Sequence, residues 1–246
     1  MRPDQVDSPL LSLRGVTKRF GGVVANRDVS FDVRAGELVG LIGPNGAGKS
    51  TLFEIISGFC APDAGEVRLE GRRLTSLSPD RVSRLGVGRT FQKLRPFAGL
   101  TVAENVMVGA LQKCHDVRRA RGEALEILAR VGLEEKTDVH ARTLSTGQRK
   151  RLELARALAA RPRVLLMDEV TSGVDQRSIP PLVDLVRGLH RDGLTVIVIE
   201  HNMRVITTLC ERVLALHLGQ VIAEGPPATV TRDPRVIEAY LGQVYV

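Results

Sequence analysis

One short stretch decides the fold: Gly43-Pro44-Asn45-Gly46-Ala47-Gly48-Lys49-Ser50. It fits the spacing G-x-x-x-x-G-K-[ST], in which glycines let backbone N–H groups turn inward around phosphate oxygens. The apolar run at 37–42 predicts a buried strand before it, and we expect a helix at 49–57 after it. A helix N-terminus favours an anion, because its dipole adds positive potential there. The stretch therefore predicts a nucleotide-phosphate site.

The same loop assigns roles to single residues. We expect Lys49 to reach the β- and γ-phosphates and the Ser50 hydroxyl to ligate Mg²⁺. The predicted ligand is therefore ATP with Mg²⁺. The predicted nucleotide contacts in this run are Gly43, Pro44, Asn45, Gly46, Ala47, Gly48, Lys49, Ser50 and Thr51.

Outward from the loop, short apolar runs alternate with a helical pattern. Further strands are expected at 10–15, 29–33, 65–70, 163–168 and 195–200, and a helix at 181–191. Such alternation indicates a parallel sheet covered by helices. The fold class is therefore α/β.

The middle of the chain, about 101–160, has helical spacing throughout. We expect four residues on one buried helix face: Ala124, Leu125, Leu128 and Val131. This region predicts a helical subdomain inserted into the α/β core.

Composition limits the class of protein. Hydrophobic residues make up 43% and charged residues 26%, which is ordinary for a globular protein. The longest apolar runs, such as 164–167 and 196–199, are far too short to cross a bilayer, and the polar start has no signal-peptide centre. We therefore expect the chain in the cytoplasm.

The net charge of +7 indicates an anionic neighbour: a nucleotide, a nucleic acid or a lipid surface. Aromatic residues are only 3% and tryptophan is absent, which argues against nucleic acid because stacking platforms need aromatic rings. Cys60, Cys114 and Cys210 are far apart and make no metal-ligand spacing.

Two carboxylates, Asp168 and Glu169, end the apolar run at 164–167. Ligands of open α/β sheets bind beyond the carboxyl ends of the strands, so both acids should face the phosphate loop. Asp168 is placed to hold Mg²⁺, and Glu169 to orient and deprotonate an attacking water. Neighbouring side chains of a strand point in different directions, which supports different roles.

Three further features distinguish this chain from a generic phosphate-loop protein. Leu144-Ser145-Thr146-Gly147-Gln148 precedes a helical segment at 149–160 and predicts a second anion-binding helix N-terminus. Gln92 ends the segment Gly88–Gln92, which we place just after the sheet. His201 follows the strand at 195–200 and so should lie at the same sheet edge as Asp168. We interpret the basic run 149–151 as a solvated helix face.

In this order the motifs resemble the ATP-binding cassette superfamily. Gly43–Ser50 resembles its Walker A motif, Val164–Glu169 its Walker B motif with the catalytic glutamate, and Leu144–Gln148 its signature motif. Gln92 matches the Q-loop glutamine, which also approaches Mg²⁺, and His201 the switch histidine. The expected catalytic residues are thus Glu169, His201 and Gln92, and the expected metal ligands Ser50, Gln92 and Asp168.

This resemblance has implications for fold and assembly. It implies a P-loop NTPase core with an N-terminal antiparallel β subdomain, in one nucleotide-binding domain at 10–242: core at 10–92 and 162–242, helical subdomain at 93–161. Two cassettes, identical or paralogous, would pair head to tail, with ATP between the Walker A of one and the signature of the other. Ser145, Gly147 and Gln148 would then contact the partner's nucleotide, and Phe20 would stack on adenine.

A closer resemblance is to ATP-binding subunits of branched-chain amino acid importers. It is carried by four runs: 89–92, 100–106, 199–203 and 236–242. It implies membrane permease subunits, an extracytoplasmic solute-binding protein and a peripheral place at the cytoplasmic membrane face. Urea importer and lipopolysaccharide exporter ATPases share parts of this pattern, so the substrate stays open. Val170 and Val174 stand where the superfamily commonly has proline and leucine.

Two other classes compete with a transport motor. A DNA-repair ATPase would need a long coiled coil between Gly43 and Leu144, and a translation factor would carry two cassettes; neither fits this chain. A regulatory nucleotide-binding module without turnover is disfavoured by Glu169 and His201. A phosphate-release assay separates it from a motor.

Overall fold

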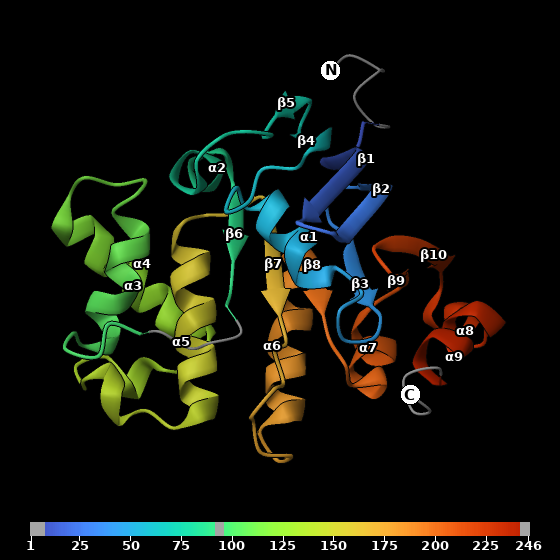
Figure 1. Cartoon of the computed structure of the whole chain (residues 1–246). Coiled ribbons are helices and arrows are strands. Elements are labelled where there is room, and N and C mark those ends of the chain that lie inside the picture. The colour runs from blue at the N-terminus through green and yellow to red at the C-terminus, as the bar shows by residue number, and fades with distance from the viewer. Residues whose placement is uncertain (1–7, 92–95, 242–246) are drawn as a thin grey trace.

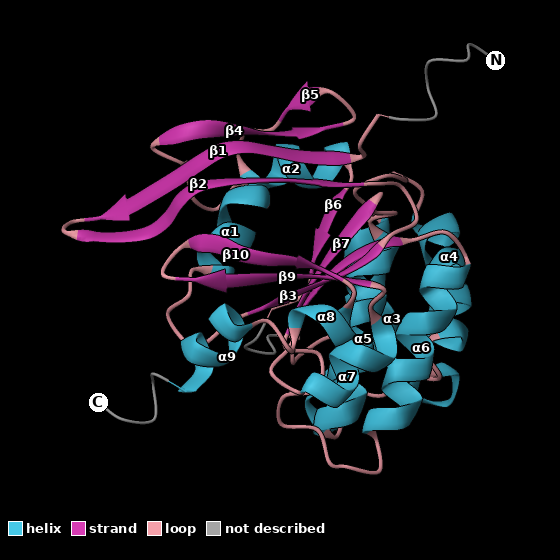
Figure 2. Cartoon of the chain, turned by 90° about the vertical axis from the view of Figure 1, so that its right-hand side faces the viewer, coloured by secondary structure: helices cyan, strands magenta, loops and turns pink. Residues whose placement is uncertain are grey.

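The computed structural model describes residues 8–91 and 96–241 of the 246-residue chain. It contains two sheets and a separate group of helices (Figure 1). The antiparallel sheet forms one layer and the larger sheet a second, with helices beneath it (Figure 2). The predicted α/β class, with an antiparallel β subdomain and a helical insert, is confirmed.

The larger sheet has six strands in the order β10-β9-β3-β8-β7-β6 and is parallel except for the β9–β10 pair. Its strands are β3 (Leu38–Ile42), β6 (Val87–Arg89), β7 (Val164–Asp168), β8 (Thr195–Ile199), β9 (Arg212–His217) and β10 (Gln220–Gly225). The central strands are buried on both faces, because Val39 and Leu41 join one apolar cluster while Leu38 and Ile42 join another. Since β3, β7 and β8 run in parallel, their carboxyl ends share one edge.

The smaller sheet is antiparallel, in the order β2-β1-β4-β5. Its strands are β1 (Leu11–Phe20), β2 (Val23–Val33), β4 (Ala64–Leu69) and β5 (Arg72–Arg73). The first two strands are longer than the apolar runs predicted, and they pair as far as Phe20 and Val23. Register shifts between Leu13 and Arg19 interrupt this pairing, so buried and exposed residues do not alternate regularly along the distal half of the hairpin.

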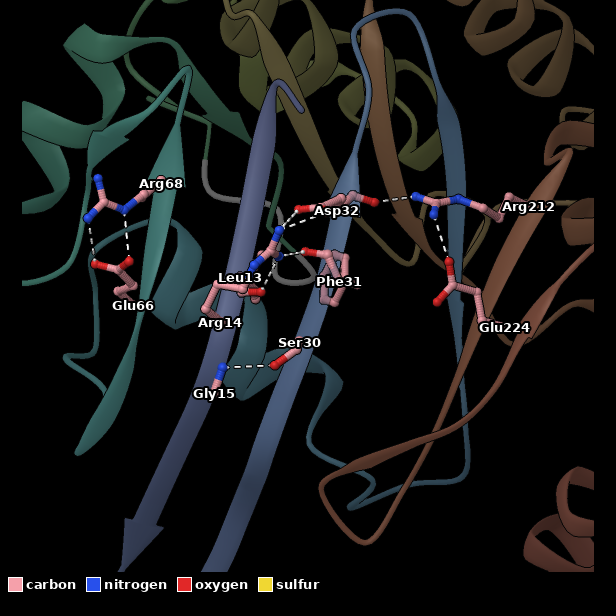
Figure 3. Close-up of polar contacts among 10 residues, drawn as sticks. All are labelled: Leu13, Arg14, Gly15, Ser30, Phe31, Asp32, Glu66, Arg68, Arg212 and Glu224. Carbon is pink, nitrogen blue, oxygen red and sulfur yellow. Dashed lines mark hydrogen bonds and ion pairs between the residues drawn. The ribbon is translucent and has the colours of Figure 1, made fainter. Parts of the chain in front are cut away.

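Polar contacts join the two sheets (Figure 3). Arg14 on β1 pairs with Asp32 on β2 through a hydrogen bond of 2.8 Å. Arg212 on β9 donates to the Asp32 carbonyl oxygen and, at 2.7 Å, to the Glu224 carboxylate of β10. A third contact, at 3.0 Å, reaches Glu37 before β3. One guanidinium on β9 therefore connects β2 of the small sheet to β10 and to the start of β3 in the large one.

Helices cover both faces of the large sheet. They are α1 (Lys49–Ile56), α2 (Pro79–Leu85), α6 (Ile179–Arg191), α7 (Met203–Leu209), α8 (Pro227–Val230) and α9 (Pro234–Leu241). Helix α1 lies between the sheets and fills that core with Leu52, Phe53 and Ile56. Helices α6 and α7 pack on the opposite face. Along the described ranges, no helix combines the length and apolar character that a membrane span requires.

The helical insert lies beside β6 (Figure 1) and has its own apolar core. It contains α3 (Val102–Ala110), α4 (Val117–Arg130) and α5 (Thr146–Ala159), with 3₁₀ turns at Glu134–Lys136 and Ala141–Thr143. Ala124, Leu128 and Val131 are fully buried as predicted, but the prediction for Leu125 was wrong, because it is 39% exposed. At about 100° per residue, Leu125 lies a quarter-turn away from the face shared by the other three.

The start of the segment that was placed just after the sheet was also predicted wrongly. Gly88 and Arg89 lie in β6, the edge strand of the large sheet, and pair with Leu165 and Leu166 of β7. Thr90 extends this pairing, because its N–H donates to the Leu166 carbonyl oxygen at 2.9 Å. This strand has only three residues, too few to show a period in the sequence.

Candidate functional site

The phosphate loop connects β3 to α1 and requires glycine where the chain passes closest to its neighbours. Gly43 has φ 149° and Gly48, the N-cap of α1, has φ 99°. A Cβ at Gly43 would lie 2.2 Å from the Leu216 carbonyl oxygen, and one at Gly48 would lie 2.2 Å from that of Ala25. Any other residue would force the loop away from β2 and β9. The G-x-x-x-x-G spacing therefore has a local steric cause.

Lys49 begins α1 and is only 5% exposed. Its ammonium donates to the carbonyl oxygens of Gly43, at 2.6 Å, and Pro44, at 2.9 Å. Burial lowers the pKa of Lys49, while the carboxylates of Glu169 and Asp168 oppose that shift. The loop therefore folds around its own cation, next to two acids.

The acids at the end of β7 point to different partners. Asp168 is 5% exposed, and its Oδ2 lies 3.6 Å from the Arg89 guanidinium. Burial raises the pKa of Asp168, and Arg89 opposes the rise. Glu169 instead places Oε1 3.0 Å from Nε2 of His201, which follows β8. The predicted proximity of these three residues at one sheet edge is thus observed.

A cleft of about 440 Å³ lies above this edge. Its lining comprises Val23, Val24, Ala25, Asn45, Gly46, Ala47, Gly48, Lys49, Ser50, Thr51, Glu169, Ile199 and His201. Most of the predicted loop residues, the predicted general base and the histidine therefore meet in one hollow. Gly43, Pro44 and Asp168 are buried and do not line the cleft.

Phe20 ends β1 at the rim of this cleft. It is 50% exposed, and the Lys18 ammonium lies 5.4 Å from its ring centroid. Its strand partner across the hairpin, Val23, lines the cleft. The ring is thus half-exposed beside the site and is not part of the apolar core.

The second predicted anion site lies elsewhere, at the start of α5. Ser145 is the N-cap of a capping box: its hydroxyl accepts the Gln148 N–H at 3.3 Å, and Gln148 Oε1 accepts the Ser145 N–H at 3.0 Å. Ser145 is exposed and Gly147 half-buried. None of the three lines the cleft, so within one chain the structure does not bring them to the phosphate loop.

Gln92 lies outside the described residues. The chain that leads to it is fixed beside Asp168, whose N–H donates to Thr90 Oγ1 at 3.3 Å.

Sequence reasoning missed Lys150 and Tyr240. The basic run at 149–151 is not a solvated face, because Lys150 is 7% exposed and donates to the Glu169 carbonyl oxygen at 2.8 Å. Tyr240 of α9 accepts the Gly43 N–H at 2.8 Å. Neither contact has a spacing signal, since each joins distant parts of the chain.

The glycine loop, its lysine and the acidic end of a parallel strand define a P-loop nucleotide-binding ATPase. Comparisons with known proteins narrow this class. A family model described as "ABC transporter" matches residues 26–172, and one described as "Branched-chain amino acid ATP-binding cassette transporter" matches residues 220–246.

Relatives of known name agree with these models. The chain is 37% identical to the high-affinity branched-chain amino acid transport ATP-binding protein LivG of Salmonella typhimurium, over 97% of this chain and 100% of that protein. It is 36% identical to BraF of Pseudomonas aeruginosa, a transport ATP-binding protein described in the same words, over 96% and 98%. It is also 37% identical to the lipopolysaccharide export system ATP-binding protein LptB of Acidithiobacillus ferridurans, over 97% and 99%.

Solved structures share the fold. The ADP conformation of MJ1267, an ATP-binding cassette of an ABC transporter, superposes with a TM-score of 0.86 at 32% identity, over 96% of this chain and 99% of that one. A dimeric cassette, MJ0796 bound to ADP and Pi, gives 0.80 at 31% identity, over 88% and 98%. The chain therefore belongs to the ATP-binding subunits of ABC transporters, in the branched-chain amino acid subgroup. It is an ABC ATPase, and cassettes of this family pair as dimers.

Proposed function

We propose that this chain drives the import of branched-chain amino acids or similar small polar solutes through a membrane permease, at the cytoplasmic membrane face. The named relatives and the match at residues 220–246 support this substrate class. An extracytoplasmic solute-binding protein would deliver the solute. The proposed nucleotide-binding domain spans 10–242, with its helical subdomain at 93–161.

In this proposal two cassettes close head to tail on ATP. The phosphate loop of one protomer holds the triphosphate, and Ser145, Gly147 and Gln148 of the other complete the site. The γ-phosphate then contacts both protomers, so its loss removes charge-assisted hydrogen bonds across the interface. Hydrolysis would therefore let the cassettes separate, and Phe20 would cover the adenine.

The single observation that carries the catalytic assignment is the 3.0 Å contact between Glu169 Oε1 and His201 Nε2, in the same cleft as Lys49. The Glu169 carboxylate would accept a proton from the attacking water, and His201 would hold that carboxylate in place. Lys49 would stabilise negative charge on the transferring phosphoryl group. Gln92 is proposed to help orient the water.

The residues at this site fit Mg²⁺. Ser50 offers an exposed hydroxyl at the start of α1, and Asp168 offers a buried carboxylate, both oxygen ligands that Mg²⁺ prefers. No cluster of three His, Cys, Asp or Glu side chains suited to a metal occurs in the described ranges, so phosphate oxygens and waters would complete the shell. Ser50, Asp168 and Gln92 are the proposed ligands. The ion would neutralise charge developing on the phosphates.

The proposed contact surface for a permease helix is a hollow of about 320 Å³ between β6 and the helical insert. Exposed Phe59 and Phe91 line it with their rings edge to face, 5.8 Å apart, and the Arg89 guanidinium lies 5.8 Å from the first ring and 5.1 Å from the second. Nearby, Phe97 is 43% exposed and lies 4.6 Å from the Arg156 guanidinium. A cysteine placed at Phe97 should crosslink to the permease, and complete failure to do so would count against this dock.

The decisive experiment replaces Glu169 by Gln. The variant should bind ATP as tightly as the wild type, remain dimeric with ATP in gel filtration, and release phosphate about 10²–10⁴-fold more slowly. Wild-type turnover in this variant would reject the assignment. The substrate class would be tested by comparing the uptake of leucine with the uptake of urea into vesicles that contain the co-purifying membrane subunits.

A further inference from the structure

Two charged side chains of α5, in the helical insert, contact residues that follow strands of the large sheet. Lys150 and Glu153 are three residues apart and so lie on one helix face. They are only 7% and 8% exposed. Burying a charge is unfavourable unless it is well paired, so the partners of these two side chains decide what the burial achieves.

Lys150 holds the main chain of Glu169. Its Nζ donates to the Glu169 carbonyl oxygen at 2.8 Å. On the other side, the Glu169 N–H donates to the Ile199 carbonyl oxygen at 3.0 Å, and the carboxylate contacts His201. The residue is therefore held at its carbonyl by α5, and at its amide and side chain by the end of β8 and the residue two positions beyond it.

The backbone at Glu169 needs such support. Its φ is 51°, in the left-handed region that a glutamate rarely adopts. A residue in this region is held there by its surroundings, and such conformations cluster at functional sites. Since φ and ψ decide where the side chain points, the contact from Lys150 helps set the direction of the carboxylate.

Glu153 makes a matching contact on the next strand. Its Oε1 accepts the N–H of Phe91, two residues beyond the end of β6. Because β6 and β7 are neighbours in the sheet, one face of α5 is tied to two adjacent strand ends. Ser145 is the N-cap of the same helix.

We propose that Lys150 is a positioning residue for ATP hydrolysis, which links the direction of the Glu169 carboxylate to the helix that Ser145 caps. This inference rests on the proposed function. In the proposed dimer, Ser145 contacts the partner's nucleotide while Glu169 acts on the nucleotide of its own protomer. Helix α5 would thus link two ATP sites of the dimer. Ser145 at its start would contact the partner's ATP, and Lys150 would hold Glu169 at the ATP of its own protomer.

The test replaces Lys150 by Met, which keeps the apolar stem and removes the donor, and by Arg, which restores a donor. The matched control is Lys113→Met, because the Lys113 ammonium also donates to a backbone carbonyl, that of Arg84, at 2.6 Å. Phosphate release as a function of ATP concentration gives kcat and KM. Titration of a fluorescent ATP analogue gives the affinity and shows that each variant is folded.

Lys150→Met should lower kcat about tenfold or more while the analogue affinity and KM stay within about threefold, because a misdirected group costs rate rather than binding. Lys150→Arg should recover most of kcat, and Lys113→Met should match the wild type. A purely structural lysine would instead weaken binding and turnover together.

Wild-type kcat in Lys150→Met would overturn the inference while the proposed function stands. Equal loss of kcat and affinity in both the Met and the Arg variants would overturn it as well. A wild-type chain that neither binds nor hydrolyses ATP would refute the proposed function itself, and this inference with it.

Discussion

Tyr240 and Gly43 are 197 residues apart, yet the Tyr240 hydroxyl accepts the Gly43 N–H at 2.8 Å. Gly43 is the first residue of the phosphate loop, and Tyr240 lies in the last turn of α9. Burial raises the pKa of Tyr240, so its phenol stays neutral. The C-terminal helix therefore fixes the point where the chain leaves β3 and enters the loop.

Tyr240→Phe should destabilise both the fold and the nucleotide site. Removing the hydroxyl leaves a half-enclosed N–H without its acceptor, which costs about 1–2 kcal/mol of unfolding free energy. ATP affinity should fall severalfold, because the loop loses one fixed end. Urea unfolding and nucleotide titration measure the two effects. Ile237→Ala, at a 44% exposed position of the same helix, is the control and should change neither. Unchanged stability in the Phe variant would remove this role from Tyr240.

His201→Ala should lower kcat by about 10²-fold with little change in ATP affinity, because it removes the partner that holds the Glu169 carboxylate. On the Glu169→Gln background the same change should have almost no further effect, since residues that act as a unit are not additive. Single-turnover phosphate release measures both. If the rate of the double variant fell by the product of the two single-variant reductions, the two residues would act independently.

Glu153 should make stability depend on pH. Burial raises its pKa to about 7, against the opposing effects of the Phe91 N–H and the charges of Lys150 and Arg156, while Asp168 adds to the rise. Its Oε2 has no hydrogen-bond partner among the described residues and is free to carry the proton. The folded state thus binds this proton more tightly than the unfolded state does.

The free energy of unfolding should therefore fall as the pH rises. The stabilisation is complete below the ordinary glutamate pKa, near 4.5, and is lost as pH rises through about 7. Between pH 5.5 and 8 the unfolding free energy of the wild type should fall by about 2 kcal/mol relative to that of Glu153→Gln, because the glutamine cannot titrate. Urea unfolding of both proteins at the two pH values measures this. A constant difference would show that the carboxyl titrates normally.

The phosphate loop, the acidic end of β7 and the histidine after β8 could be predicted because each depends on a short run with fixed spacing. The β–helix alternation gave the parallel sheet for the same reason. The role of Lys150 could not be predicted, since a lysine in a helix has the same pattern whether it faces water or reaches a carbonyl oxygen across a domain.

Other differences have equally local causes. Leu125 was expected in the core because leucine is apolar, but its angle around α4 places it outside the buried face. The distal half of the β1–β2 hairpin contains register shifts and polar pairs such as Lys18 and Asn26, so it shows no regular apolar period in the sequence. Tyr240 could be connected to Gly43 only once the topology brought α9 beside the loop.

Two capping boxes in the described part of the chain allow helix stability and nucleotide contact to be tested separately. Thr101 caps α3 and Ser145 caps α5, each with its hydroxyl on the N–H three residues later. Thr101→Ala and Ser145→Ala should each cost about 1 kcal/mol of unfolding free energy, because each leaves one helix N–H without its acceptor.

Only Ser145→Ala should weaken ATP-driven pairing, because only α5 is proposed to meet the partner's nucleotide. Introduced into the Glu169→Gln background, it should raise the ATP concentration needed for the dimer by about tenfold, the equivalent of one lost charge-assisted hydrogen bond. Thr101→Ala should leave that concentration unchanged, and sedimentation velocity with increasing ATP measures both. If the two variants weaken dimerisation equally, the effect comes from helix stability, and the serine does not touch the partner's phosphate.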